Sequence, residues 1–396
     1  MGEWKSCTLS SLGTIVGGAT PSTKKPENYE GGTIPWITPK DLSGFAGRYI
    51  SHGERNITEK GLNSCSAQMM PEHSVLFSSR APIGYVAISN CEVCTNQGFK
   101  SIVPSENTDY LFLYYLLQYK KKDIENLGTG TTFKEVSANT MKSVEVRVPA
   151  EKYEQIKIAR VLSAIDDKIE ANTRINENLE QQAQAYFQEL FVDNADPEWT
   201  TGTISDLGTV VGGSTPSKAK PEYYTETGIA WITPKDLSIN KSKFVSHGEN
   251  DITELGLKNS SAVIMPEGTV LFSSRAPIGY IAIAAGEVTT NQGFKSVVPK
   301  SEVGTPFVYF FLKNTLPVIE GMASGSTFKE VSGSTMKNVP AVIPDAETLA
   351  KFSDFCAPIF AQQHILEGQN QSLATLRDNL LPKLMSGEID VSAVHL

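Results

Sequence analysis

The chain has 396 residues, of which 40% are hydrophobic and 20% are charged, and its formal net charge at pH 7 is −9. These values fit a globular protein long enough for two or three domains, and the acidic balance excludes a global positive field that attracts nucleic acid. Because the N-terminus lacks the apolar core of a signal peptide and no apolar run reaches the ~18 residues of a membrane span, we expect a cytoplasmic protein.

The first 150 residues predict one mixed α/β domain. Short β-rich runs bounded by turn residues predict strands at 75–78, 85–89 and 100–104. The apolar stretch 109–119 predicts a buried helix, and 144–148 predicts a closing strand. This segment holds 15 basic and 14 acidic side chains, so local basic clusters are available in it although the whole chain is acidic.

Residues 151–192 predict one long helix. Its seam residues alternate at spacings of four and three, which is the heptad pattern of a helix that packs against another helix. A straight helix of this length is roughly 60 Å long at 1.5 Å per residue. The predicted seam consists of Ile158, Leu162, Ile165, Ile169, Asn172, Asn176, Leu179, Ala183, Tyr186 and Leu190.

Residues 193–344 repeat the first 150 residues at a constant offset of 195. The block Trp36–Ser43 recurs at Trp231–Ser238, and Leu76–Tyr85 recurs unchanged at Leu271–Tyr280. A constant offset means that the loops have matching lengths in both copies, so we predict the same fold twice. Further repeated blocks are 95–101 with 290–296, 132–137 with 327–332, and 140–142 with 335–337.

Residues 345–396 predict a second long helix and a tail, with Pro358 expected to kink or restart the helix. Either the two helices pack against each other, or each completes the core of its own domain. The apolar stripe continues beyond what one small domain needs, which favours mutual pairing. The predicted second seam consists of Phe352, Phe355, Ile359, Gln362, Leu366, Gln369, Leu373, Leu376 and Leu380.

The predicted fold class is therefore α/β (α+β). Two tandem homologous globular domains are separated and joined by two long antiparallel coiled-coil-like helices. The expected boundaries are 1–150, 151–192, 193–344 and 345–396.

The sequence shows no constellation for catalysis. It has no GxxxxGK[ST] phosphate loop, no HExxH motif and no adenine-methyltransferase tetrapeptide. Cys91 and Cys94 form a CxxC that resembles half a zinc site, but the second copy has glycine and threonine at these positions, so reduced structural thiols are favoured. His52 and His247 are shared between the copies and indicate paired surface or turn histidines. We expect no metal, no cofactor and no intrinsic catalysis.

The copies do share polar and cationic residues in turns. Arginine can make two-point contacts with guanine or phosphate, asparagine and glutamine can pair with adenine edges, and serine, threonine and lysine can hold phosphates. The alternatives are that Arg80 pairs with an acid inside the fold and that Asn96 and Gln97 cap a turn. The candidate DNA-contacting residues are Lys40, Ser78, Ser79, Arg80, Asn96, Gln97, Lys100, Thr132 and Lys134 in the first copy, and Lys235, Ser273, Ser274, Arg275, Asn291, Gln292, Lys295, Thr327 and Lys329 in the second.

At these residues the chain resembles the specificity subunits of bacterial type I restriction-modification systems. The resemblance covers nearly the whole length. The motifs that carry it are the Trp-Ile-Thr-Pro-Lys-Asp-Leu, Leu-Phe-Ser-Ser-Arg-Ala-Pro-Ile-Gly-Tyr and Thr-Asn-Gln-Gly-Phe-Lys blocks, the segment 130–137, the helix opening 155–169 and the tail 376–389.

The resemblance implies a non-catalytic subunit in which 1–150 and 193–344 are target recognition domains that read the two halves of a split double-stranded DNA site. It also implies that the helices set the spacing and dock two methyltransferase subunits, to which restriction and translocase subunits add. Family members commonly carry two different recognition domains, whereas these are close copies. Equal readers related by an approximate two-fold imply a target close to an inverted repeat, with half-site centres ~34 Å apart. Differences between the half-sites would arise where the copies differ, as at 44–48 against 239–243 and at Arg55 against Asn250.

Two other classes of function remain open. A twofold scaffold could clamp partner proteins without reading DNA. A duplex-binding assay at several salt concentrations separates it from a DNA reader, because phosphate contacts predict a steep loss of affinity as salt rises. A nuclease would need clustered acids, yet the shared pairs Asp41 with Asp236 and Glu135 with Glu330 show no metal-ligand spacing.

Overall fold

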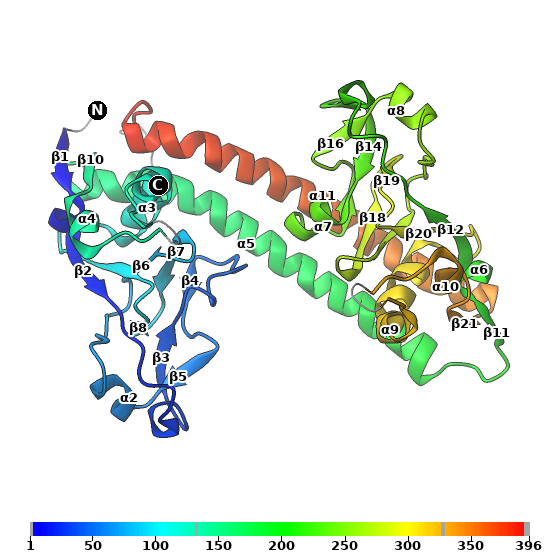
Figure 1. Ribbon diagram of the computed structural model, residues 1–396, viewed down its shortest axis with the longest axis horizontal. Helices are drawn as coiled ribbons and strands as arrows, with labels where there is room; N and C mark the ends of the chain where they lie inside the picture. The colour runs from blue at the N-terminus through cyan, green and yellow to red at the C-terminus, as the bar shows by residue number, and fades with distance from the viewer. Residues whose placement is uncertain (1–2, 131–133, 326–328, 392–396) are drawn as a thin grey trace. The chain divides into compact units, whose positions relative to one another are not determined.

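The computed structural model describes residues 3–130, 134–325 and 329–391. The chain forms two compact units, Met1–Ala171 with Gln371–Leu396 and Asn172–Asn370, here called unit 1 and unit 2. The division falls inside both long helices, so each helix contributes one part to each unit (Figure 1).

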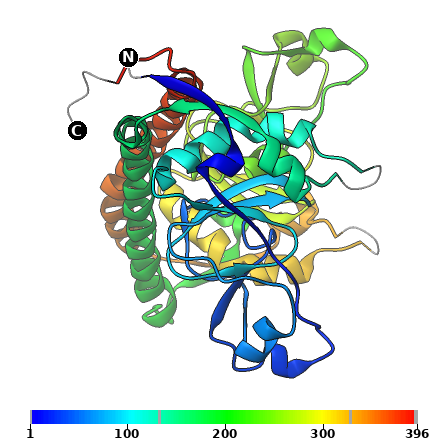
Figure 2. The same cartoon turned by 90° about the vertical axis from the view of Figure 1, so that its left-hand side faces the viewer.

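Unit 1 is built on a five-stranded sheet of order β2-β9-β6-β7-β4, with a three-stranded sheet β5-β3-β8 and a pair β1-β10. The small sheet and α2 form a lobe at the end of the unit opposite β1 and β10 (Figures 1 and 2). The elements are β1 (Trp4–Thr8), α1 (Leu9–Leu12), β2 (Gly13–Gly17), η1 (Pro26–Asn28), β3 (Ile34–Ile37), β4 (Tyr49–Ile50), β5 (Arg55–Ile57), α2 (Glu59–Asn63), β6 (Val75–Ser79), β7 (Ile83–Ser89), β8 (Cys94–Thr95), β9 (Lys100–Pro104), α3 (Tyr110–Asn126), α4 (Ala138–Ser143), β10 (Glu145–Pro149) and α5 (Lys152–Gln188).

Unit 2 repeats this topology, with sheets β12-β20-β17-β18-β15, β13-β16-β14-β19 and β11-β21. Its small sheet has one strand more, β13, and the turn after β14 is a short helix, α7. The elements are η2 (Glu189–Asp193), β11 (Thr200–Thr203), α6 (Ile204–Leu207), β12 (Gly208–Gly212), η3 (Pro221–Tyr223), β13 (Tyr224–Thr225), β14 (Ile229–Ile232), α7 (Pro234–Ile239), β15 (Phe244–Val245), β16 (Asn250–Ile252), α8 (Glu254–Lys258), β17 (Val270–Ser274), β18 (Ile278–Ala284), β19 (Thr289–Thr290), β20 (Lys295–Pro299), α9 (Thr305–Met322), α10 (Gly333–Lys337), β21 (Pro340–Ile343) and α11 (Ala346–Ser386).

The large sheet of unit 1 is buried on both faces because residues alternate along β6. Val75 and Phe77 pack with the apolar side chains of α3, while Leu76 joins the core on the opposite face. The same alternation recurs in unit 2, where Val270 and Phe272 face α9 and Leu271 faces the other core. The end of β6 and the turn that follows it carry three of the candidate DNA-contacting residues, Ser78, Ser79 and Arg80.

The predicted elements agree with the structure at their positions and differ at some ends. The helix predicted at 109–119 is α3, whose N-cap is Asp109, since its side chain accepts a hydrogen bond of 2.8 Å from Phe112 N. It continues to Asn126 because its Lys-rich last turns lie at the surface, where no apolar pattern marks them. Pro358 does not restart α11, which is continuous and exposes this proline.

The positions of the heptad seam predicted on α5 lie on the inward side of the helix. Ile158, Leu162 and Asn172 are fully buried, and the remaining predicted positions are half-buried or buried. In unit 2 the two helices are antiparallel, since Asn172 bonds Asn370, Asn176 accepts from Gln363, and Tyr186 contacts Phe352.

The seam predicted on α11 has the wrong register at every second position. Phe352, Ile359, Leu366, Leu373 and Leu380 are buried or half-buried, as expected. Phe355 and Leu376, however, are 39% and 47% exposed, and Gln362 and Gln369 are exposed as well. The inward positions in their place are Cys356, Gln363, Asn370 and Arg377. Three of these four inward residues are polar, while Phe355 and Leu376 beside them are large and apolar. The apolar pattern therefore predicted the wrong side of the helix at these positions.

Candidate nucleic-acid interface

Each copy contains a surface hollow at the turns that the repeated motifs form. We call the hollow lined by Thr38, Pro39, Lys40, Arg80, Ala81, Asn96 and Gly98 cleft 1; its volume is about 570 Å³. Cleft 2 has about 690 Å³ and is lined by the equivalent residues of unit 2 and by Thr215, Lys218, Tyr224, Trp231, Asp236, Glu249, Asn250 and Gln292. The structure thus brings together, from three separate segments in each copy, residues that the sequence nominated for DNA contact.

The repeated serines build the turn between β6 and β7. Ser78 Oγ accepts from Tyr85 N at 2.8 Å and donates to Pro82 O at 2.8 Å, and Ser79 Oγ donates to Gly98 O at 3.2 Å. Ser273 and Ser274 make the same bonds in unit 2, and all four side chains are fully buried. These hydroxyls cannot reach a DNA backbone, so the expectation that they do is wrong. Their role is to shape the turn that presents the following arginine.

An acidic side chain holds two cations at each cleft. Glu135 accepts from Arg80 Nη1 at 3.4 Å and from Lys100 Nζ at 3.5 Å. In unit 2, Glu330 pairs with Arg275 at 3.4 Å and with Lys295 at 3.7 Å. The arginines are about one third exposed, whereas the lysines are largely buried, and burial lowers the pKa of Lys295. Sequence reasoning foresaw an internal acid as the alternative for Arg80, but it did not identify Glu135. The signal available in the sequence was that Arg80 and Glu135 both recur at the offset of 195, as Arg275 and Glu330.

Asparagine and glutamine at the β8–β9 turn are partly engaged inside each unit. Asn96 Oδ1 accepts from Gly98 N at 2.8 Å, and Asn291 does the same with Gly293. Because this oxygen is used, Asn96 caps the turn and is not set up for a two-point adenine contact. The exposed Gln97 and Gln292 accept from Thr20 and Thr215 through Oε1, and their amide nitrogens remain on the surface side of the turn as donors.

The remaining cations lie at the surface. Lys40 pairs with Glu54 at 2.6 Å and Lys235 with Glu249 at 2.6 Å, and these four side chains are mostly exposed. Lys134 and Lys329 are exposed too. The candidates Thr132 and Thr327 lie outside the described residues.

The model of the type I restriction modification DNA specificity domain matches residues 1–181 and 197–380. The chain belongs to this family. The type I restriction enzyme MjaIX specificity subunit of Methanocaldococcus jannaschii is 34% identical over 98% of this chain and 94% of its own length. The HindI specificity subunit of Haemophilus influenzae is 25% identical over 74% of this chain and 76% of its own length. A solved type I S subunit from M. genitalium shares the fold, with a TM-score of 0.62 and 19% identity over 97% of this chain and 96% of that one.

The resemblance and the fold class predicted from the sequence are therefore confirmed. The chain is a type I restriction-modification specificity subunit, whose role is DNA recognition within a larger assembly. Both curated relatives are named as specificity subunits of type I restriction enzymes.

Two buried cations attach the domains of the specificity subunit to its long helices. Arg48 and Lys243 occupy equivalent positions and are 5% and 7% exposed. Arg48 pairs with Asp167, and with Glu170 at 2.9 Å, both on the part of α5 in unit 1. Arg48 and Lys243 end the segments 44–48 and 239–243, and both point into the helices, so these two side chains are not available to DNA. That the other residues of the two segments contribute to half-site differences stays a prediction.

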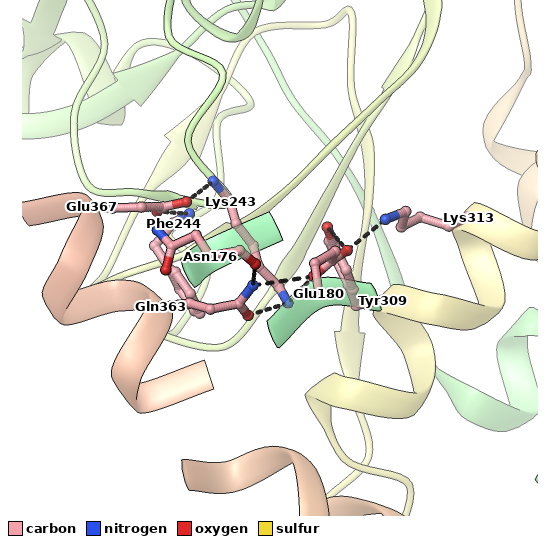
Figure 3. Close-up of polar contacts among 8 residues, drawn as sticks. All are labelled: Asn176, Glu180, Lys243, Phe244, Tyr309, Lys313, Gln363 and Glu367. Atoms are coloured by element: carbon pink, nitrogen blue, oxygen red, sulfur yellow. Dashed lines mark hydrogen bonds and ion pairs between the residues drawn. The ribbon is translucent and has the colours of Figure 1, made fainter. Parts of the chain in front are cut away.

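Lys243 lies in a buried polar and aromatic cluster (Figure 3). Its Nζ contacts Glu180 at 2.8 Å and Gln363 at 2.9 Å, and it lies 3.5 Å from the centre of the Phe360 ring. Burial lowers the pKa of Lys243 to about 8, even though Glu180 favours the charged form. Burial opposes ionisation of Glu180 too, but Lys243 and Lys313 together lower the pKa of Glu180 to about 2. The group is thus a fixed ion cluster at neutral pH.

Cys94, the second cysteine of the CxxC, is a buried thiol. Its Sγ lies 3.5 Å from Pro35 O, and burial raises the pKa of this thiol to about 12. Within residues 3–130, 134–325 and 329–391, no three His, Cys, Asp or Glu side chains cluster as metal ligands would. In the same part of the chain no helix has the length and apolar character needed to cross a membrane.

Proposed function

We propose that cleft 1 and cleft 2 each contact one half of a split double-stranded DNA target. The observation that carries the proposal is that Arg80 lines cleft 1 and Arg275 lines cleft 2, each paired with a glutamate that also binds a lysine. The arginines have the geometry for two-point contacts with guanine or phosphate, and the exposed Lys134 and Lys329 supply further charge. The proposed contact set is Lys40, Arg80, Gln97, Lys100 and Lys134 with Lys235, Arg275, Gln292, Lys295 and Lys329.

The proposed domain division follows the sequence: recognition domains at 1–150 and 193–344, and helical spacers at 151–192 and 345–396. It is supported by the ends of the elements, since β10 ends at Pro149 and α11 begins at Ala346. We further propose that the helices set the spacing of the half-sites and dock two methyltransferase subunits, which restriction and translocase subunits join. Exposed apolar side chains on the helices, such as Ile175, Ile365 and Leu376, support a docking role.

The salt dependence of duplex binding tests this function. Full chain assembled with its methyltransferase partner is titrated with target DNA between about 50 and 200 mM salt. We expect affinity to fall steeply with salt. We also expect Arg80→Ala with Arg275→Ala to weaken binding and to reduce the slope of log affinity against log salt by ~1 for each phosphate that is no longer neutralised. Lys351→Ala, which removes one charge from an exposed position on α11, is the control and should leave both unchanged.

A scaffold that does not read DNA predicts a different outcome. Assembly with the partner would persist, but affinity for duplex would be weak and would not respond to the two arginine substitutions. That result would overturn the proposed function.

A further inference from the structure

The two copies share one strand frame around a position that differs between them: Asn250 lines cleft 2, whereas Arg55 lies over the Tyr29 ring and is not among the residues that line cleft 1. Arg55 is the first residue of β5 and pairs across the sheet with Trp36. Asn250 is the first residue of β16 and pairs with Trp231 in the same register. Both side chains are exposed, so each is available to a molecule that approaches the cleft.

The aromatic groups beneath this position are the same in both copies. The rings of Trp36 and Tyr29 pack edge to face with their centres 6.0 Å apart, and Trp36 Nε1 donates to Ala19 O at 3.0 Å. In unit 2, Trp231 meets Tyr224 at 5.7 Å, and its Nε1 donates to Ser214 O at 2.9 Å. Because the backbone register and the aromatic pair are the same in both copies, an exchange of the single side chain at 55 and 250 does not require the frame to change.

What differs is the surface above the rings. The Arg55 guanidinium lies 4.2 Å from the centre of the Tyr29 ring, and cleft 1 does not include the aromatic pair. In unit 2, Tyr224, Trp231 and Asn250 all line cleft 2, which is larger by about 120 Å³. One copy therefore presents a planar cation over a tyrosine ring, and the other presents a carboxamide in the wall of a hollow that its tyrosine and tryptophan also line.

We propose that positions 55 and 250 determine specificity, by setting the base pair at which the two half-sites differ. This inference rests on the proposed function. Arginine pairs through two hydrogen bonds with O6 and N7 of guanine, and asparagine pairs in the same way with N6 and N7 of adenine. We expect a guanine at the position that Arg55 reads and an adenine at the position that Asn250 reads. Among the residues that line cleft 2, Lys218 is the other one that differs from its counterpart in the first copy, Thr23, and it is less suited to base readout because lysine is a point charge without paired donors.

The test exchanges the two residues in the assembled methyltransferase complex and determines the methylated motif by long-read sequencing of host DNA. Arg55→Asn should convert one base pair of the first half-site to that of the second, and Asn250→Arg should do the reverse. The double exchange should interchange the two base pairs between the half-sites. The proposal is overturned if the motif stays unchanged and only the extent of methylation falls, because Arg55 would then hold a phosphate.

A control exchange is available on α2 and α8. Asn63→Lys with Lys258→Asn swaps two exposed side chains that also differ between the copies and that line neither cleft. It should leave the motif unchanged; if it shifts the motif as the exchange at 55 and 250 does, the proposed assignment is wrong. Failure of the inference is distinguishable from failure of the proposed function: in the first case the unaltered complex still methylates a split motif, and in the second it does not.

Discussion

At the scale of single residues, Glu135 and Glu330 are internal counterions for cations that face the clefts. They keep Arg80 and Arg275 in place without DNA, and a phosphate or guanine must compete with them for the arginines. Such competition lowers affinity for all sequences, and only a target that offers two good hydrogen-bond acceptors offsets it. The acids thereby favour selectivity over strength of binding.

Removal of these acids should strengthen unspecific binding. Glu135→Gln with Glu330→Gln releases partly exposed ion pairs worth up to about 1 kcal/mol each, so we expect affinity for random duplex to rise roughly fivefold per cleft. The measurement is a competition between target and random duplex at fixed salt, which should show a smaller ratio of affinities for the double variant. An unchanged ratio would mean that the acids only support the fold.

The ion cluster around Lys243 is expected to contribute to the free energy of unfolding. Glu180→Gln leaves Lys243 buried without its counterion, so we expect a loss of about 3 kcal/mol in the free energy of unfolding near pH 7. Lys313→Met is the milder control, because Lys313 is 35% exposed. Urea unfolding of the full chain measures both, and equal small effects would contradict the ion-cluster assignment.

The ion pair between Glu180 and Lys243 also predicts that the stability of the fold depends on pH. The pKa of Glu180 is about 2 in the folded state against 4.5 ordinarily, so as pH falls the unfolded state takes up the proton first. The stabilisation by this carboxylate is therefore complete above about pH 5 and is lost as pH falls toward 2. The difference in stability between the natural chain and Glu180→Gln should shrink over this range; a constant difference would argue against it.

At the scale of elements, α11 carries polar residues at one inward heptad position, where Gln363, Asn370 and Arg377 bond α5. Arg377 Nη1 contacts Asp166 Oδ1 at 2.9 Å within unit 1, and Asn370 accepts from Asn172 at 2.9 Å within unit 2. Polar seam residues fix register at a cost in stability. Asn172 shows this cost, since its Oδ1 is buried and lacks a hydrogen-bond partner.

Apolar replacement of one such pair should stabilise the helices. Asn172→Leu with Asn370→Leu removes the unsatisfied oxygen, and we expect a gain of about 1 kcal/mol in unfolding free energy. Thermal unfolding of the full chain gives the sign. A lower midpoint would show that the amide pair stabilises the fold and does more than fix its register.

Elements were easier to predict than side-chain roles. Strands β6 and β9 and the α5 seam follow from local periodicity, which depends only on near neighbours in sequence. The register of α11 did not follow, because its inward polar residues are satisfied by partners on α5 that no local pattern displays. For the same reason the serines of the β6–β7 turn were misassigned: a repeated polar residue looks alike whether it faces DNA or the core.

At the scale of the whole molecule, two nearly equal readers in one chain favour a target with nearly equal halves. If the domains meet the two strands in opposite polarity, the half-sites form an inverted repeat interrupted by unread bases. Because the two copies differ at few positions around the clefts, the two half-sites should then differ at few base pairs.

Methylome sequencing of the source cell with and without this chain tests DNA recognition most directly. We expect a split methylated motif whose halves agree, in inverted orientation, at most positions, and which disappears when the chain is removed. A motif that persists without the chain, or one whose halves are unrelated, would contradict recognition by two equal clefts.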